Sequence, residues 1–357
     1  MVSNQFRLPN FSTHASIFLI CAVLFASCST SSHGSVPTPA PTQTAAPAAN
    51  LTPTTAQTTP IPKPDGWCDS SEQIPNDFLI VGYLPEYRTL NPDWGNCLTD
   101  IIYFSAEPTA NGELDTSRLN PATFGLLQNM KEKYGTRIHV AVGGWGRSEH
   151  FSTVVTNPEI RTVFANNLIR FAQENNLDGF DFDWEFPKTD ADRNGYSALF
   201  SEVKAHNLMI SVALAPANKL DPEIYRQTDR IHIMSYDHHP LHATLEQAMV
   251  DVHQFIEAGN PPEKLLLGIP FYGRQIIEPY TAMTYAEIMQ QYSPDPQTDE
   301  VDGIFFNGIY TVQQKTRYAR ENDLGGIMIW ELGQDSVEAN SLLQAIYSAA
   351  IQNNPND

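Results

Sequence analysis

Three carboxylates recur at every second position in one short segment of the sequence. Residues 178–185 read DGFDFDWE, so that Asp181, Asp183 and Glu185 alternate with aromatic residues. Because side chains alternate between the two faces of a β-strand, the three carboxylates would share one face, at steps of roughly 6–7 Å. The aromatic residues would pack on the other face. The pattern therefore predicts a buried strand that brings three acids together.

Like charges held this closely need a physical reason. Burial of three carboxylates is unfavourable unless some are protonated, hydrogen-bonded or bound to a metal. A proton shared among them raises the pKa of at least one, so that Glu185, outermost on the strand, can stay protonated near neutral pH. Protonation of a glycosidic oxygen requires such a group. The segment thus favours a general acid that cleaves glycosides.

A metal site and a solvated surface strand are the alternatives to this interpretation. A surface strand would not be flanked by two phenylalanines and a tryptophan. A hard divalent cation draws its ligands from several elements, and the other strand ends offer mainly aromatic and small residues. No G-x-G-x-x-G follows the first predicted strand, which argues against a dinucleotide. We therefore expect neither a metal nor another cofactor.

Eight apolar, β-branched runs predict the strands that would position these acids. They are Phe78–Leu84, Asp100–Ala106, Arg137–Gly143, Gly179–Glu185, Met209–Ala215, Arg230–Tyr236, Lys264–Phe271 and Gly326–Trp330. Near-continuous apolar strands that alternate with helices are typical of a parallel sheet buried on both faces. Eight such units in about 290 residues predict an α/β fold, a (β/α)8 TIM barrel in a single catalytic domain, rather than an open doubly wound sheet. The active site of such a barrel lies at the C-terminal ends of its strands.

Helical patterns fall between the predicted strands. The clearest are Pro158–Asn175, Ser197–His206, Leu245–Ala258, Thr311–Glu321 and Val337–Ile351. In the first of them, five apolar residues recur at helical spacing and should face the sheet, namely Ile160, Val163, Phe164, Leu168 and Phe171.

The N-terminal part differs from the rest in composition. Residues 1–28 resemble a secretory signal whose apolar run of about 12 residues is too short to cross a bilayer. The letters LFASC at 24–28 resemble a bacterial lipobox, which predicts lipidation of Cys28, with ordinary cleavage near Ala26 or Ser27 as the alternative. Residues 29–64 are rich in Thr, Pro, Ala and Ser and predict an extended linker. We expect a lipoprotein on the cell surface or outer membrane, or otherwise a secreted protein.

Residues 65–357 form the predicted catalytic domain. Outside the signal, Cys68 and Cys97 remain, and in an oxidising compartment they could form a disulfide. The formal charge of −20, from 41 acidic and 21 basic residues, argues against nucleic acid as a partner. A neutral polysaccharide carries no such demand for basic residues. We expect a monomer that meets the membrane only through its lipid anchor.

The acidic segment resembles the D-G-x-D-x-D-x-E signature of glycoside hydrolase family 18, the chitinases and endo-β-N-acetylglucosaminidases. Four further segments resemble family elements at the ends of the third, sixth, seventh and eighth strands. They read AVGGW at 141–145, MSYD at 234–237, GIPFYGR at 268–274 and GGIMIW at 325–330. The resemblance covers essentially residues 78–350 in the right order. It implies a retaining hydrolase of β-1,4-linked N-acetylglucosamine glycans such as chitin.

The resemblance also implies a role for each site residue. Glu185 would be the general acid and base, Asp183 would orient the acetamido N–H of the substrate, and Asp181 would hold or exchange a proton with Asp183. Tyr236 would hydrogen-bond the acetamido oxygen, which attacks the anomeric carbon in place of an enzyme nucleophile. Tyr83 would support Asp181 by a hydrogen bond. Substrate contacts are expected from Tyr83, Trp145, Met234, Asp237 and Trp330.

Two departures from the family pattern affect this expectation. Ala141 stands where the family usually has Ser, so Asp181 loses one expected hydroxyl donor. About 28 residues separate Arg274 from Asp302, too few for the α+β insertion that walls one side of the cleft in many members. A shallow groove follows, which favours shorter or branched ligands and endo action.

Other interpretations stay open at this point. The three histidines His238, His239 and His242 suggest a metal site, but their Pro-interrupted spacing favours a loop that lines the cleft. One alternative with the same chemistry is an endo-β-N-acetylglucosaminidase that acts on N-glycans or on peptidoglycan. A second alternative, from a different functional class, is a surface glycan-binding lectin. A lectin has no need for Glu185.

Overall fold

The computed structural model describes residue 68 and residues 73–218, 220–336 and 339–352. The predicted signal at 1–28, with Cys28, and the predicted linker at 29–64 lie outside the described residues. Within the described ranges, none of the helices is both long and apolar enough to span a membrane.

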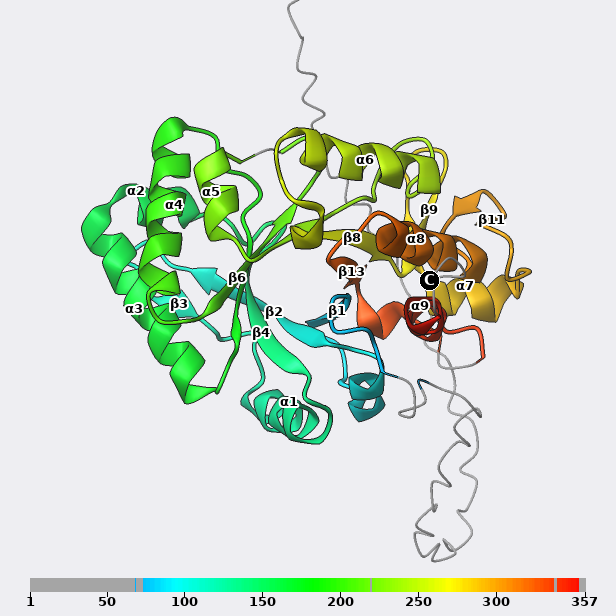
Figure 1. Cartoon of the computed structure of the whole chain (residues 1–357), viewed down its shortest axis with the longest axis horizontal. Helices are drawn as coiled ribbons and strands as arrows, with labels where there is room; N and C mark the ends of the chain where they lie inside the picture. The colour runs from blue at the N-terminus through cyan, green and yellow to red at the C-terminus, as the bar shows by residue number, and fades with distance from the viewer. Residues whose placement is uncertain (1–67, 69–72, 219, 337–338, 353–357) are drawn as a thin grey trace, which may run out of the picture. The chain divides into compact units, whose positions relative to one another are not determined.

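A closed barrel of eight parallel strands forms the centre of the domain (Figure 1). The strands are β1 (Leu79–Pro85), β2 (Asp100–Pro108), β4 (Arg137–Gly143), β5 (Gly179–Asp183), β6 (Met209–Leu214), β7 (Arg230–Ile233), β8 (Leu265–Pro270) and β13 (Gly326–Trp330). Strand β1 pairs with both β2 and β13, which closes the barrel. The short β3 (Leu114–Asp115) extends β2 as an antiparallel edge. The predicted TIM barrel is confirmed, and each predicted strand overlaps an observed one.

Helices surround the barrel, with α2 to α5 on one side and α7 to α9 on the opposite side (Figure 1). Their bounds are α1 (Pro121–Tyr134), α2 (Phe151–Thr156), α3 (Pro158–Glu174), α4 (Asp190–Lys204), α5 (Pro222–Gln227), α6 (Leu245–Glu257), α7 (Tyr285–Tyr292), α8 (Ile309–Glu321) and α9 (Leu342–Ile351). Short 3-10 turns are η1 (Pro92–Asn96), η2 (Pro262–Lys264) and η3 (Leu332–Gln334).

The helix bounds differ from the sequence prediction where local capping decides them. Helix α4 begins at Asp190, well before the predicted Ser197, because Thr189 and Asp192 form a capping box. Helix α9 begins only at Leu342, after the capping side chain of Ser341.

Apolar side chains of the barrel separate into an outer and an inner layer. Phe180, Phe182 and Trp184 lie in the outer layer between strands and helices, as the alternation predicted. Val163 of α3 is 43% exposed and does not face the sheet, since the buried face of this helix is centred on Phe164 and Leu168. The inner layer fills the barrel and consists of Val81, Tyr83, Ile102, Phe104, Ala141, Leu266 and Met328.

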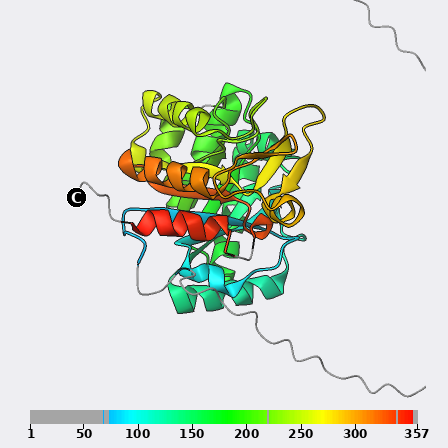
Figure 2. The same ribbon diagram turned by 90° about the vertical axis from the view of Figure 1, so that its right-hand side faces the viewer.

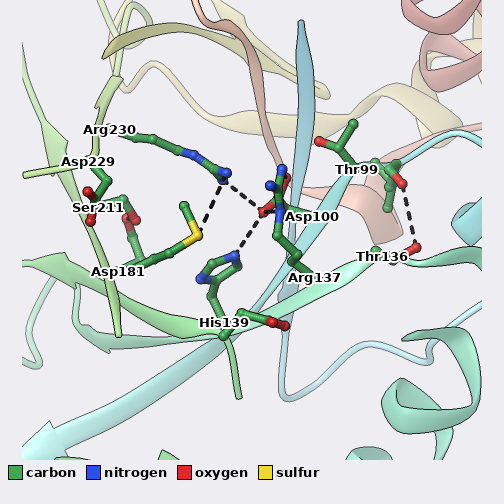
Figure 3. Close-up of polar contacts among 12 residues, drawn as sticks. Thr99, Asp100, Thr136, Arg137, His139, Asp181, Ser211, Asp229 and Arg230 are labelled. Carbon is green, nitrogen blue, oxygen red and sulfur yellow. Dashed lines mark hydrogen bonds and ion pairs between the residues drawn. The ribbon is translucent and has the colours of Figure 1, made fainter. Parts of the chain in front are cut away.

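A buried ion cluster closes the N-terminal end of the barrel (Figure 3). Asp100 is fully buried, and Arg137 donates two hydrogen bonds of 2.8 Å to its carboxylate. Arg230 donates a third at 2.8 Å, and His139 lies at 2.9 Å. Burial would raise the pKa of Asp100, but these partners hold it well below its usual range. The cluster fills this end of the barrel with paired charges.

A small antiparallel sheet lies between β8 and α8 in the sequence and packs beside α7 (Figure 2). Its strands, in the order β10-β9-β12-β11, are β9 (Tyr272–Gln275), β10 (Ala282–Thr284), β11 (Glu300–Val301) and β12 (Ile304–Phe305). The described residues contain no larger insertion domain at this position, in agreement with the short spacing in the sequence. Near the start of the domain, a disulfide joins Cys68 to Cys97, with a Cα–Cα distance of 5.4 Å.

Candidate active site

A cavity of about 680 Å³ lies at the C-terminal ends of the barrel strands. All the residues predicted to act in catalysis or to contact substrate line it, except the deeper Asp181. The predicted residues in its wall are Tyr83, Trp145, Asp183, Glu185, Met234, Tyr236, Asp237 and Trp330. The fold therefore brings segments from β1, β4, β5, β7 and β13 to one place.

Asp181 lies at the bottom of the site, where it is fully buried. Tyr83 Oη donates to Asp181 Oδ2 at 2.6 Å, which is the expected hydrogen bond, and Ser211 Oγ donates to Oδ1 at 2.6 Å. The Nδ1 atom of His232 lies 3.0 Å from Oδ1. Burial would raise the pKa of Asp181, but His232, Ser211 and Tyr83 together lower it. Asp181 is thus held as an anion.

Ser211 supplies the hydroxyl that the change to Ala141 removes. In the barrel register, Asp181 pairs with Ala141 of β4 on one side and with Ser211 of β6 on the other. In this chain the hydroxyl donor to Asp181 therefore stands on β6 instead of β4. The sequence analysis did not identify Ser211 and His232, although the side-chain alternation of β6 and β7 points both residues into the barrel.

Asp183 has a different environment from Asp181, although both side chains point into the barrel from β5. It is 5% exposed, and its Oδ1 has no hydrogen-bond partner among the described residues. Burial, together with the charges of Glu185 and Asp181, raises its pKa well above the usual range. The surroundings of Asp183 therefore favour its protonated form, and Oδ1 is free to meet a ligand.

Glu185 follows the end of β5 and is half-buried in the cavity wall. Its backbone N–H donates to Ser148 Oγ at 3.2 Å. Burial and the negative charge of Asp237 raise the pKa of its carboxyl to about 7. A carboxyl with this pKa can both give and take a proton near neutral pH, as a general acid and base must.

Asp237 is held by residues of the small sheet. Tyr272 Oη donates to its Oδ1 at 2.7 Å, and Arg274 Nη2 donates to its Oδ2 at 2.9 Å. Burial would raise the pKa of Asp237, but the hydrogen bonds from Arg274 and Tyr272 hold it far below the usual range. Strand β9 thus contributes a wall of the cavity that carries a fixed negative charge beside Glu185.

Aromatic rings form the floor and rim of the cavity. The Trp330 ring meets the rings of Phe104 and Tyr83 edge to face, at centroid distances of 4.9 and 5.5 Å. These contacts hold the indole in one orientation. Trp145, by contrast, is 82% exposed at the rim. A flat indole floor and an exposed rim tryptophan suit the apolar faces of sugar rings.

The three histidines after β7, the sixth strand of the barrel, do not line the cavity, contrary to the sequence prediction. His238 lies 2.9 Å from Asp251, and His239 stacks on Tyr280 with a ring distance of 4.2 Å. His242 is buried behind Asp237. Across the part of the chain that the structure describes, no group of three His, Cys, Asp or Glu side chains could hold a metal ion.

Known proteins match this chain over most of the barrel. Residues 79–335 match the sequence profile of Glycosyl hydrolases family 18. Probable chitinase 2 of Drosophila melanogaster is 26% identical, over 75% of this chain and 74% of that protein. Probable chitinase 10 of the same species is 26% identical over 60% of this chain, but the match spans only 13% of that protein.

Solved structures agree with this match. The GH18 chitinase ChiB from the chitin utilization locus of Flavobacterium johnsoniae superposes with a TM-score of 0.66 at 28% identity, over 76% of this chain and 94% of that chain. A Group IV chitinase of Ostrinia furnacalis superposes with a TM-score of 0.67 at 26% identity, over 77% of this chain and 100% of that chain.

Proposed function

This chain belongs to glycosyl hydrolases family 18, and on that ground we propose that it cleaves β-1,4-linked N-acetylglucosamine glycans, chitin or chito-oligosaccharides. Family membership makes it a glycosidase, an enzyme that hydrolyses glycosidic bonds. The relatives named above are called chitinases, which supports chitin as the substrate class.

The charge state of the three carboxyls that line the cavity carries the proposal. Burial and the charges of Glu185 and Asp181 raise the pKa of Asp183, which favours its protonated form, and Asp237 is hydrogen-bonded by Tyr272 and Arg274. Glu185 alone combines access to the cavity with a pKa of about 7. An enzyme nucleophile would require a second free carboxylate. The arrangement therefore supports attack by the acetamido oxygen of the substrate itself.

In the proposed reaction, Glu185 donates its proton to the glycosidic oxygen while the 2-acetamido oxygen attacks the anomeric carbon. The glycosidic bond breaks, and a cyclic oxazolinium ion forms. Asp183 accepts a hydrogen bond from the acetamido N–H, and Asp181 exchanges a proton with Asp183. Glu185, now a carboxylate, takes a proton from the water molecule that opens the ring, which restores the starting state.

Tyr236 fixes the acetamido group for this attack. Burial beside Tyr272 and the acids raises the pKa of its phenol well above the usual range, so the hydroxyl stays protonated and donates to the acetamido oxygen. Positioning of this kind contributes several kcal/mol to the lowering of a barrier. Trp330 stacks under the sugar whose bond is cleaved, and further substrate contacts come from Tyr83, Trp145, Met234 and Asp237.

An endo-β-N-acetylglucosaminidase that acts on N-glycans or peptidoglycan is the second candidate within this chemistry, because it would use the same acetamido group. A glycan-binding lectin is disfavoured, because binding alone does not need a carboxyl with a pKa of about 7 at Glu185. Product analysis by mass spectrometry separates these candidates. Chitin oligomers, a high-mannose glycopeptide and peptidoglycan are offered side by side, and only chitin oligomers should be cleaved rapidly.

The variant Glu185→Gln tests the catalytic assignment. We expect turnover of a chromogenic chito-oligosaccharide to fall by at least about 10²–10⁴-fold, the usual contribution of a general acid, while binding is retained. Glu149→Gln is the matched control, because Glu149 is exposed on a neighbouring loop. Unchanged turnover in the Glu185 variant would remove the basis of the mechanism.

We also propose that the enzyme is exported and anchored through a lipid on Cys28. The support is the lipobox-like segment at 24–28, followed by the linker at 29–64, which carries almost no charge. A tethered barrel on a linker of this composition can reach an extracellular polymer.

A further inference from the structure

His242 connects two elements that carry cavity residues, although it does not line the cavity itself. It lies in the loop after β7 and is 1% exposed. Its imidazole packs on the ring of Tyr272 in β9, with a centroid distance of 4.6 Å and an angle of 45° between the planes. Loop and strand are far apart in the sequence, so the histidine is a tertiary link between them.

Nδ1 of His242 faces Asp237, and Nε2 faces Tyr272. Nδ1 accepts the backbone N–H of Asp237 at 3.0 Å and also lies 3.3 Å from its Oδ1, while Nε2 donates to the backbone carbonyl of Tyr272 at 3.1 Å. A backbone N–H can only donate, and a carbonyl can only accept, so the two backbone contacts require the neutral Nε2–H tautomer. Burial lowers the pKa of His242, in keeping with a neutral ring.

The backbone that His242 holds is in an unfavourable conformation. Asp237 has a φ of +62°, in the left-handed region that residues with a side chain seldom adopt. On the carboxylate side, Tyr272 and Arg274 of β9 bind Asp237. His242 therefore contacts both residues of the Tyr272–Asp237 hydrogen bond, because it binds the amide of Asp237 and the carbonyl of Tyr272.

We propose that His242 is a positioning residue, which fixes the negative charge of Asp237 beside Glu185 by tying the loop after β7 to β9. The proposal rests on the proposed role of Glu185 as general acid. His242 touches neither substrate nor reacting atoms, and it acts only through Asp237.

The contacts of His242 should affect the pKa of Glu185, because charged groups surround this carboxyl. Burial is the largest cause of the raised pKa of Glu185, and the negative charge of Asp237 is the second. The other titratable groups that face this part of the site are Asp183 of β5, Tyr236 after β7, and Tyr272 and Arg274 of β9. Lys315 of α8 adds a positive charge near His242. If Asp237 becomes mobile, the pKa of Glu185 falls, and the acid form is lost at a lower pH.

Two amide substitutions separate the two contacts of His242. Gln can present a donor near the position of Nε2, so H242Q keeps the link to Tyr272 and loses the acceptor for Asp237. Asn can present an acceptor near the position of Nδ1, so H242N keeps the contact with Asp237. We expect the alkaline limb of the kcat/KM profile to move to lower pH in H242Q, and to move in the same direction but less far in H242N, which still holds the amide of Asp237 but loses the link to β9. For H242Q we also expect kcat/KM to fall by about 10- to 100-fold, as for other displaced site residues.

The neighbouring His239→Asn is the matched control and should leave the profile unchanged, because the His239 ring stacks on Tyr280 and makes no hydrogen bond to Asp237 among the described residues. In a D237N background, H242Q should cause no further shift, since the charge that it positions is gone. A shift of equal size in H242N, or an additive shift in the D237N background, would overturn the proposal. If H242Q does not fold, H242N and the D237N/H242N pair carry the same decision.

A readout without substrate keeps this inference separate from the proposed function. The carboxyl of Glu185 is titrated in the full chain by ¹³C NMR, with Glu185→Gln used to identify its signal. We expect a midpoint near the pKa of about 7 in the parent protein and a lower midpoint in H242Q. A parent protein that cleaves no chitin oligomer would contradict the proposed function while this titration still decides on His242. Equal midpoints in parent and H242Q would refute the role of His242.

Discussion

Asp181 and Asp183 are two residues apart on β5, yet their surroundings drive their proton affinities in opposite directions. Asp181 has three polar partners, Tyr83, Ser211 and His232, whereas Asp183 Oδ1 has none among the described residues. A carboxylate with several donors keeps its charge in spite of burial, and one without donors takes up a proton. The same strand thus presents one carboxyl with a lowered pKa and one with a raised pKa.

The register around Asp181 gives a prediction at the scale of single residues. Ser211→Ala removes a hydrogen bond of 2.6 Å to this buried carboxylate. We expect kcat/KM to fall by about 10- to 100-fold, which corresponds to the roughly 1.5–3 kcal/mol of a hydrogen bond to a charged group. The double variant A141S/S211A should recover much of the loss, because Ala141 is the neighbour of Asp181 on the other side.

Kinetics of the parent, S211A and A141S/S211A on one chito-oligosaccharide check this prediction, with thermal unfolding as the control for stability. Equal losses in the single and double variants would show that the hydroxyl on β4 cannot replace the one on β6.

The acidic residues of the site could be predicted from the sequence because their spacing alone puts them on one face of a strand. Ser211 and His232 could not be predicted in the same way. Their contact with Asp181 depends on the register between β5, β6 and β7, and local sequence patterns do not fix a register. His242 was noticed in the sequence, but its burial behind Asp237 follows only from the position of β9.

At the scale of elements, strands were easier to predict than helices. Strand β5 has an uninterrupted alternation that specifies it, whereas α1 was not predicted. Its signals were present, with Asn120 as the N-cap, Pro121 in the first turn and Gly135 after the last. The four short strands of the small sheet were also missed, since two to four residues are too few to show a period.

Two glycines test the packing of these elements. A Cβ on Gly125 of α1 would meet no atom within 4 Å, so Gly125→Ala should stabilise the protein by about 0.5–1 kcal/mol through helix propensity. A Cβ on Gly273 of β9 would lie 2.8 Å from Ile304 Cγ2 and 2.8 Å from Phe305 O, so Gly273→Ala should destabilise it. Urea unfolding of both variants measures the two effects, and a stabilised Gly273 variant would contradict the packing of the small sheet.

At the scale of the whole molecule, the barrel separates two charged ends. Asp100 and its cationic partners fill the N-terminal end of the barrel, and the catalytic carboxyls lie at its C-terminal end. The apolar inner layer, which includes Val81, Ile102 and Met328, lies in the same barrel interior. The barrel was predictable because each of its strands needs two apolar faces, while the ion cluster depends on which strands become neighbours.

Export is tested on the full chain in a bacterial host. If Cys28 is lipidated, the protein should sediment with membranes and incorporate labelled palmitate, and Cys28→Ala should abolish both. Intact mass spectrometry of the mature N-terminus checks the cleavage site. A mature chain that begins before Cys28 without a lipid would instead indicate ordinary signal cleavage near Ala26 or Ser27.

The central claim is that the acetamido group of the substrate, rather than a carboxylate of the enzyme, attacks the anomeric carbon. Inhibition by a thiazoline analogue of N-acetylglucosamine, a mimic of the cyclic intermediate, tests it most directly. We predict competitive inhibition with an affinity at least about 10²-fold higher than that for the sugar product, as for an analogue of a reactive intermediate. No inhibition, together with a stable covalent glycosyl adduct on Asp183, Glu185 or Asp237, would contradict the account.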